Sequence, residues 1–464
     1  MSYTKSIKKV ANLTNHIHAL CRMKWWMLLL FMGSITVLPA QDLQFFALRD
    51  IWQLQQLQPA YMPNKKITVG IMGLQFETKR RGLSWSDVFR TSRDTLYINP
   101  SRGIQNAALE NYYAINVDVP TFFAAVRFDP LWSFSISYRL RSYNEVMIPR
   151  DVFRLLLHGN GQLINEKLYI GLGSHFMNYR ELGLGIARQW NDWKFGVRVS
   201  LLTGKFLLYT PRRELYFTTH DDWYQWTVES NYRLMSSNVV PEAVNTTLQF
   251  FTGGLVPNFR NIGASISLGA TYRWRDILDL HASVTDIGFI RWGSSNSMQL
   301  SITGTSTFTG FQDFIRLDSL TLSDTTFTNL IDTTKRFFEE LDYAVDHKFR
   351  TSLPWSLVLG ADYQLNRHFR TGMVYRFAHG KLLSDHQLMI YLSFYPWKFL
   401  QLGTSFNVQS GSQQLGIYSS LKLAFIKTYL SLNRVYKFSG PSTGYFNFTA
   451  GVNISIGKLP KHPK

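Results

Sequence analysis

Cysteine is almost absent from this 464-residue sequence, because Cys21 is the only one. One cysteine cannot form an intramolecular disulfide, and it cannot supply a cysteine metal site. Cys21 also lies before the apolar stretch that starts near Trp25, so it cannot be a lipid attachment site behind that stretch. The fold has to be held by packing and by backbone hydrogen bonds.

Charged residues and long apolar runs are also scarce. Charged residues make up 17% of the chain, against about 25% in soluble domains. After the N-terminus, no window approaches about 18 consecutive apolar residues, which excludes helical membrane spans there. No linker rich in Pro, Gly or Ser divides the chain, so we expect one large all-β unit.

The N-terminus has the pattern of a targeting signal. Residues 23–40, MKWWMLLLFMGSITVLPA, contain one lysine, a short apolar core and then small or helix-breaking residues. This pattern predicts a signal peptide over residues 1–40, with translation starting at Met23 and cleavage after Ala40. An uncleaved membrane anchor is the alternative, which the shortness of the apolar core disfavours.

The basic excess persists after cleavage. Residues 1–40 contain five basic residues and no acidic one, so the net charge falls from +18 to +13. Such a charge fits a surface among anionic lipids, including lipopolysaccharide, although nucleic acid also attracts basic proteins. We expect no nucleic-acid partner, because the signal directs the chain out of the cytoplasm.

Alternation with a period of two dominates the rest of the sequence. Residues 262–274, IGASISLGATYRW, and 445–457, YFNFTAGVNISIG, alternate apolar with small or polar residues. Each segment predicts a strand with one apolar and one hydrated face. Soluble strands average about 5–6 residues, whereas tilted strands need roughly 9–11 to cross a bilayer, which favours a transmembrane barrel over a soluble sandwich.

The fold that we predict is all-β, a transmembrane antiparallel β-barrel over residues 65–457. We expect about 14 strands, within 12–16, because bacterial barrels favour even numbers. Aromatic residues at segment ends, as in YPWKF (395–399), suit girdles at the two interfaces. The alternation of short and long connections predicts a large external loop at Gly304–Leu353, with a short helix around Leu330–Leu341, and a basic periplasmic tail over 458–464.

Five sequence motifs occur in a familiar order. They are LQPAYMP (57–63), HGNGQ (158–162), NYRELGLGIARQW (178–190), VTDIGFIRW (284–292) and FRTSLPWSLVLGADYQL (349–365). This order resembles a Bacteroidota family of outer-membrane β-barrels of unassigned function. That family is similar to the PorP/SprF-type barrels of type IX secretion and, more remotely, to FadL-like transporters. The motif residues are Pro59, Ala60, Asp286, Gly288, Phe289 and Trp292. In the early motif, Gln58 replaces the usual Asn.

The resemblance implies a location in the bacterial outer membrane and one of two roles. The first is passage or capture of small hydrophobic ligands through a plugged lumen. The alternative is a non-enzymatic anchor or scaffold for envelope or secretion proteins. Residues 41–64 are then an inward plug or merely a leader, and the sequence leaves both open.

Chemistry-bearing residues are few. His281 and Ser283 lie two apart on one strand, as a hydrolase would need for a nucleophile and its base. However, the neighbouring apolar residues occupy the lipid face, so both should point into the lumen, and we expect no enzyme. No His or carboxylate group has metal-ligand spacing, and no cofactor is expected.

Arginines fall on the polar face of several predicted strands. They could line a positive lumen that attracts anions, or they could pair with inward carboxylates such as Asp362 or reach lipid phosphates at the strand ends. The second interpretation is favoured, because ion pairs line many barrels. The six residues are Arg127, Arg139, Arg198, Arg273, Arg370 and Arg376.

Asp286 interrupts the apolar face of its segment, since Leu280, Ala282 and Val284 precede it at even positions. After it, Ile287 and Phe289 become the apolar set. One extra residue, a β-bulge at Thr285–Asp286, would produce this change of phase and turn the carboxylate away from lipid. Alternatively, the strand leaves the membrane here, with Asp286 in the interface and Trp292 as a girdle residue.

Overall fold

The computed structural model describes residues 43–48, 50–92, 95–222, 225–238, 261–293, 296–308, 342–409, 411–438 and 443–459. The expected signal peptide (1–40), the helix expected around Leu330–Leu341 and most of the tail at 458–464 lie outside these residues. Within the described ranges, no helix has the length and hydropathy of a membrane span.

The chain forms a closed barrel of 14 antiparallel strands, as predicted. The ring closes through β1, which pairs with both β4 and β21: Ile67 lies opposite Val126 on one side and Ile456 on the other. In ring order the strands are β1 (Ile67–Arg81), β4 (Glu110–Val126), β5 (Trp132–Pro149), β7 (Gly173–Trp190), β8 (Trp193–Thr219), β10 (Ile262–Trp274), β11 (Leu278–Trp292), β14 with β15 (Phe349–Ser352 and Trp355–Gln364), β16 (Phe369–His379), β17 (Asp385–Trp397), β18 (Leu400–Gln409), β19 (Ser412–Leu423), β20 (Ile426–Lys437) and β21 (Thr443–Ile456).

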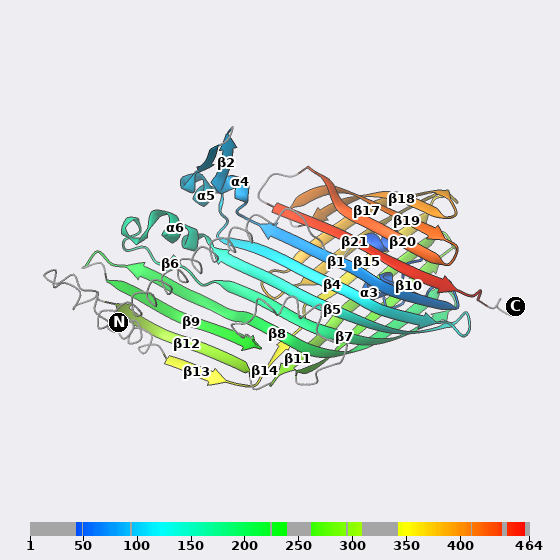
Figure 1. Cartoon of the computed structure of the whole chain (residues 1–464), viewed down its shortest axis with the longest axis horizontal. Helices are drawn as coiled ribbons and strands as arrows, with labels where there is room; N and C mark the ends of the chain where they lie inside the picture. The colour runs from blue at the N-terminus through cyan, green and yellow to red at the C-terminus, as the bar shows by residue number, and fades with distance from the viewer. Residues whose placement is uncertain are drawn as a thin grey trace, which may run out of the picture. The chain divides into compact units, whose positions relative to one another are not determined.

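The two ends of the barrel differ. At the short-turn end, brief connections join the strands, as at Asn191–Asp192 between β7 and β8. At the long-loop end, β8 extends beyond the ring and pairs with β9 (Trp226–Ser237), which pairs with β12 (Ser297–Phe308) and then β13 (Asp342–Asp346). Figure 1 shows these strands at the opposite end of the barrel from the C-terminus.

The long-loop end also carries several further small elements. They are α4 (Trp85–Val88), β2 (Phe89–Ser92), β3 (Thr95–Ile98), α5 (Pro100–Asn106), α6 (Arg150–His158), the 3-10 turn η1 (Asn160–Gln162) and β6 (Leu168–Tyr169). Within the large external loop expected at Gly304–Leu353, β12 and β13 pair outside the ring and β14 joins the ring, while residues 309–341 lie outside the described residues. Alternation is weak there, which is why the sequence suggested a loop.

The barrel is polar inside and apolar outside. On β21, Asn447, Thr449 and Asn453 are 0% exposed, whereas Val452 is 38% exposed. The outward residues of the other strands repeat this pattern, as Leu184 and Ile186 do on β7. Aromatic side chains are exposed at the short-turn end, among them Trp190, Trp193, Trp274, Trp397 and Phe399. This is the reverse of a soluble protein, whose apolar side chains are the ones that are buried.

Candidate functional site

The lumen is filled at one level by an N-terminal segment, residues 43–48 and 50–63, which we call the plug. It contains two short helices, α2 (Gln44–Ala47) and α3 (Leu54–Leu57), and nearly all of its residues are buried. Trp52 lies flat against the wall, because its ring stacks on the ring of Phe123 of β4. The two ring centroids are 4.3 Å apart, and the angle between the ring planes is 6°. A Cβ at Gly70 of β1 would lie 1.6 Å from the indole nitrogen, so only glycine leaves room for this ring.

Polar side chains from many strands hold the plug. Gln53 and Asn453 of β21 exchange side-chain amide hydrogen bonds of 3.2 Å. Gln401 of β18 donates to the Ala47 carbonyl at 2.7 Å, and Ser283 of β11 donates to the Leu57 carbonyl at 2.6 Å. Because these partners lie on widely separated strands of the ring, the plug occupies the lumen itself.

The motif residues at 58–60, near the C-terminal end of the plug, contact β8 and β10. The Gln58 amide donates to the Ala270 carbonyl at 2.9 Å, so the residue that replaces the usual Asn makes a wall contact. Pro59 lies against Gly196, where a Cβ would come within 2.2 Å of the proline carbonyl oxygen. Ala60 is 0% exposed beside Gly269. Glycines on the wall thus let the plug backbone approach.

Beside the plug lies a buried network of three arginines and three carboxylates. Arg139 and Arg141 of β5 both pair with Asp118 of β4 and Glu181 of β7. The shortest of these contacts joins Arg139 Nη2 to Glu181 Oε2, at 2.6 Å. Since each charge has an opposite partner, the cost of burying it is offset.

Arg198 of β8 and Asp286 of β11 complete this network. Arg198 donates to the plug carbonyls of Gln55 and Gln56, at 3.0 and 3.4 Å, and lies 3.4 Å from an Asp286 oxygen. Asp286 also pairs with Arg141, whose Nη1 atom lies 3.0 Å from Asp286 Oδ2. One arginine therefore links the plug to the charged interior of the wall.

Asp286 stands at a β-bulge. The register between β10 and β11 shifts between Ile266 and Leu268, and Asp286 has φ of +64°, in the left-handed region that aspartate tolerates better than most residues. Its backbone N–H donates to the Ser267 hydroxyl at 3.0 Å. After the bulge, Ile287 is 47% exposed on the outer face, so the change of phase occurs where the sequence placed it.

The alternative prediction is that the strand leaves the membrane at Asp286 and that Trp292 is a girdle residue. The placement of Trp292 in a girdle is wrong. This side chain is 1% exposed and donates to Thr351 at 2.8 Å. It packs inside the barrel with Ile290, Leu202 and Tyr179. The physical reason is the same bulge, which turns the even positions after Asp286 inward.

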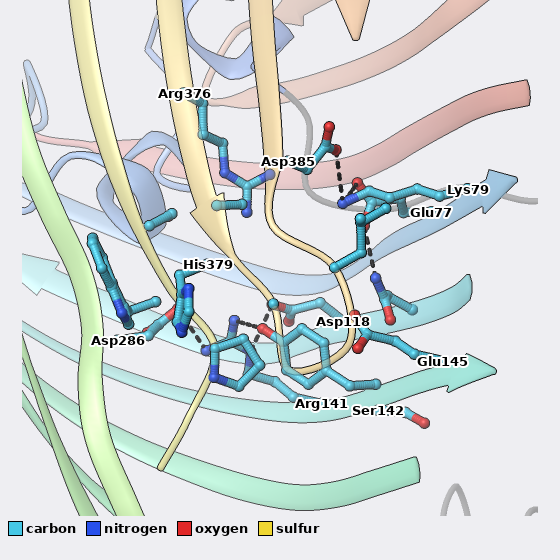
Figure 2. Close-up of a pocket in the computed structure, with 18 of the residues that line it drawn as sticks. Glu77, Lys79, Asp118, Arg141, Ser142, Glu145, Asp286, Arg376, His379 and Asp385 are labelled. Atoms are coloured by element: carbon cyan, nitrogen blue, oxygen red, sulfur yellow. Dashed lines mark hydrogen bonds and ion pairs between the residues drawn. The ribbon is translucent and has the colours of Figure 1, made fainter. Parts of the chain in front are cut away.

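On the long-loop side of this network, the lumen opens into a pocket of about 40 Å³. Lys79 of β1 lies between Glu77 and Asp385, at 3.0 and 3.3 Å (Figure 2). Asp118 is 3% exposed, and its Oδ1 atom has no hydrogen-bond partner among the described residues. The charged lining consists of Glu77, Asp118, Glu145, Asp286 and Asp385 against Lys79, Arg141 and Arg376, together with His379.

With this geometry in view, the comparisons with known proteins identify a family. The model of a family of unknown function, DUF5723, matches residues 59–433. The chain belongs to this family. The DUF5723 match runs from the motif end of the plug, at Pro59, through most of the barrel. A search of curated proteins finds no match.

Solved barrels resemble this DUF5723 chain only distantly. The Pseudomonas putida toluene transporter TodX is 11% identical with a TM-score of 0.40, over 85% of this chain and 90% of that one. The Ralstonia pickettii toluene transporter TbuX is 9% identical with a TM-score of 0.40, over 87% and 93%. A Pseudomonas aeruginosa FadL homologue is 8% identical with a TM-score of 0.40, over 86% and 91%. Likenesses this low say nothing about the ligand of this DUF5723 protein.

The six arginines expected in the lumen of the DUF5723 barrel have different surroundings. Arg139 and Arg198 lie in the buried network, and Arg376 lines the pocket. Arg370 pairs with Asp362, as the ion-pair interpretation expected. Arg127 donates to the Pro63 carbonyl at 2.8 Å and so contacts the end of the plug.

Arg273 differs from the other five. Its side chain is 45% exposed and pairs with Asp279 at 2.7 Å, close to the turn between β10 and β11. It shares the strand phase of the buried Thr271 on β10. However, a residue next to a turn at the barrel mouth stays in contact with solvent.

His281 and Ser283 do not form a pair. The His281 Nε2 atom lies 2.7 Å from Asp362, and its Nδ1 atom lies 3.2 Å from the Thr271 hydroxyl. Ser283 donates to the plug instead. Both residues serve contacts within the lumen, on the face that the alternation predicted.

Several residues of the site were missed from the sequence. Arg141 lies two residues after Arg139, so the period of two already placed it on the same inner face. Asp118 and Glu181 share the inner phase of their strands too. What the pattern could not show is that β4, β5, β7 and β11 bring these charges to one level of the barrel.

Proposed function

We propose that this chain spans the outer membrane as a plugged β-barrel. The apolar outer face, the polar lumen and the exposed aromatic side chains at the short-turn end support this placement. β10 has 13 residues, and the steps between them, at about 3.4 Å each and a tilt of roughly 40°, cover about 31 Å. That height matches the hydrocarbon core of a bilayer, about 30 Å thick.

The orientation follows from the two ends. Outer-membrane barrels have short periplasmic turns and longer external loops. The short-turn end would then face the periplasm, and the pocket would open toward the outside. A ligand arriving from outside would meet the pocket first and the plug behind it.

The activity that we propose is capture of a small ligand in this pocket and its passage when the plug moves. The observation that carries the proposal is the position of the pocket, which lies directly against the network that Arg198 connects to the plug backbone. A ligand that changed the pairing of Asp286 would weaken the hold of Arg198 on the plug. Binding and opening would thereby be coupled.

The lining of the pocket favours a polar, positively charged ligand. Five carboxylates line it against Lys79, Arg141 and Arg376. Arg139 and Arg198 pair with two of these carboxylates from behind the lining, but the Oδ1 atom of Asp118 has no donor among the described residues. A protonated amine would supply that donor. The hydrophobic ligand implied by the family resemblance stays a prediction, which this charged lining does not support.

Planar-bilayer recordings on the purified protein test the proposal. Deleting Gln41–Gln56 removes most of the plug, so single-channel conductance should rise above that of the intact protein. Calorimetry with cadaverine, pentanediol and glutarate, which share a five-carbon chain, should show binding of the diamine alone. Asp118→Asn should weaken that binding about tenfold or more, whereas Glu214→Gln, outside the pocket, should not.

The opposite results have clear meanings. If glutarate or pentanediol binds as well as cadaverine, the proposed ligand class is wrong. If the deletion leaves conductance at zero while the barrel is folded, as judged by its heat-modifiable migration on gels, passage through the lumen is wrong. Recovery of envelope proteins in pull-downs would then favour the scaffold role.

A further inference from the structure

A second feature lies on the outer face of the barrel, away from the lumen. An open groove of about 550 Å³ runs between the long-loop ends of β10, β11 and β14. Three cationic side chains line it, Arg291, Lys348 and Arg350, and the rest of the lining comes from the strand ends at Ile262, Trp292, Gly293 and Phe349. All three cations are exposed.

The groove lies at the long-loop edge of the band of apolar residues on the outer face of the barrel. On β10 the outward residues from Trp274 to Ile262 are apolar or aromatic, and Ile262 is the last of them at the long-loop end. On β11 the outward series Leu280, Ile287 and Phe289 ends at Arg291. The cations therefore begin where the apolar band stops.

The arrangement of charge is unusual for a sheet. Arg291 and Arg350 lie directly opposite each other in the register of β11 and β14. Like charges in that position are destabilising. No carboxylate among the described residues forms an ion pair with either arginine or with Lys348. The repulsion would be relieved by an anion from outside the chain.

The guanidinium groups of Arg291 and Arg350 both lie over the ring of Phe289. Arg350 Cζ lies 3.4 Å from the centroid of the Phe289 ring, and Arg291 Cζ lies 5.6 Å from the same centroid. Stacking on one ring limits the freedom of both side chains and keeps their donors close together. Planar guanidinium groups present several N–H donors in a fork that suits a phosphate group.

We propose that this groove binds a phosphate group of an anionic glycolipid in the outer leaflet of the outer membrane. The proposal rests on the outer-membrane placement proposed above. It needs no passage through the lumen. The phosphate would lie between Arg291, Arg350 and Lys348, and the acyl chains would lie along the apolar residues below them. The groove would then be a fixed lipid site on the wall.

Binding of lipid A to the purified full-length protein in detergent tests the site. Bisphosphorylated lipid A should bind the native protein, and Arg291→Gln with Arg350→Gln should lower its affinity about tenfold or more, because two charge-assisted contacts are lost. The matched control is Arg188→Gln. Arg188 stacks on Trp132 at 4.8 Å at the short-turn end, so its loss removes an outward arginine without touching the groove.

Two further probes separate the sources of binding. Lipid A lacking both phosphates should bind weakly to native and variant protein alike. Inorganic phosphate should not compete at concentrations that saturate the lipid. Equal affinity of the double variant and the native protein, equal binding of the dephosphorylated lipid, or competition by inorganic phosphate would each overturn the proposal. Channel recordings are independent of this outcome, so the two proposals fail separately.

Discussion

At the scale of single residues, Asp286 combines two unusual features. Its backbone has positive φ at a bulge, and its carboxylate lies within ion-pair distance of Arg139, Arg141 and Arg198. Asp286→Asn keeps the shape of the side chain and a residue type that tolerates positive φ. Any loss of stability in this variant therefore measures the contribution of the Asp286 negative charge.

We expect Asp286→Asn to lower the free energy of unfolding by about 3 kcal/mol, the scale of breaking a buried ion pair. Urea-dependent unfolding in detergent micelles, followed by tryptophan fluorescence, measures this change. Asp276→Asn is the control, because Asp276 also has positive φ, +59°, but lies exposed in a turn. It should change stability by less than about 0.5 kcal/mol. Equal losses in the two variants would show that the backbone, and not the charge, matters.

Gly70 makes a residue-scale prediction about the plug. An added Cβ would lie 1.6 Å from the Trp52 indole nitrogen, so Gly70→Ala must displace this ring from the wall. Conductance in planar bilayers should rise above that of the native protein, since the plug loses its stacked anchor. Gly161→Ala is the matched control, because nothing lies within 4 Å of a Cβ there. Native conductance in Gly70→Ala would mean that Trp52 does not hold the plug closed.

At the scale of elements, the sequence predicted best where one strand face meets lipid. β10 and β21 show clean alternation, and their positions followed directly from it. The upper part of β8 was missed, because residues 205–219 are interrupted by Pro211 and by charged residues. Beyond the apolar band both faces of a strand can be hydrated, so the period of two loses its physical cause. The same effect made the ends of residues 304–353 resemble a loop.

The network shows a different limit of the sequence. Its members lie on the correct inner phase of their strands, but Arg198 and Asp286 are 88 positions apart in the chain. Which charges meet depends on the stagger of each strand against the next, and alternation does not specify that stagger. The bulge at Asp286 was predictable because it changes the phase within one strand. Its three partners were not.

At the scale of the whole molecule, the proposed activity requires that the plug move while the barrel stays intact. The described strands close the ring without the plug, since β1 pairs directly with β21 and β4. The plug is joined to the wall by side-chain hydrogen bonds and ring contacts, each worth about 1 kcal/mol. Movement of the plug is therefore much less costly than opening the wall.

A covalent bridge between plug and wall separates these two motions. After signal-peptide removal the chain would contain no cysteine, so Gln53→Cys with Asn453→Cys gives two unique thiols at positions whose native side chains meet at 3.2 Å. In the Gly70→Ala background, a short bis-maleimide should return conductance to the native level, because the plug is tied to β21. A mono-maleimide at the same thiols adds bulk without a bridge and should leave the channel open. If the bridged protein still conducts at the raised level, the open path does not run through the space that the plug occupies, and the current would have to cross the wall elsewhere.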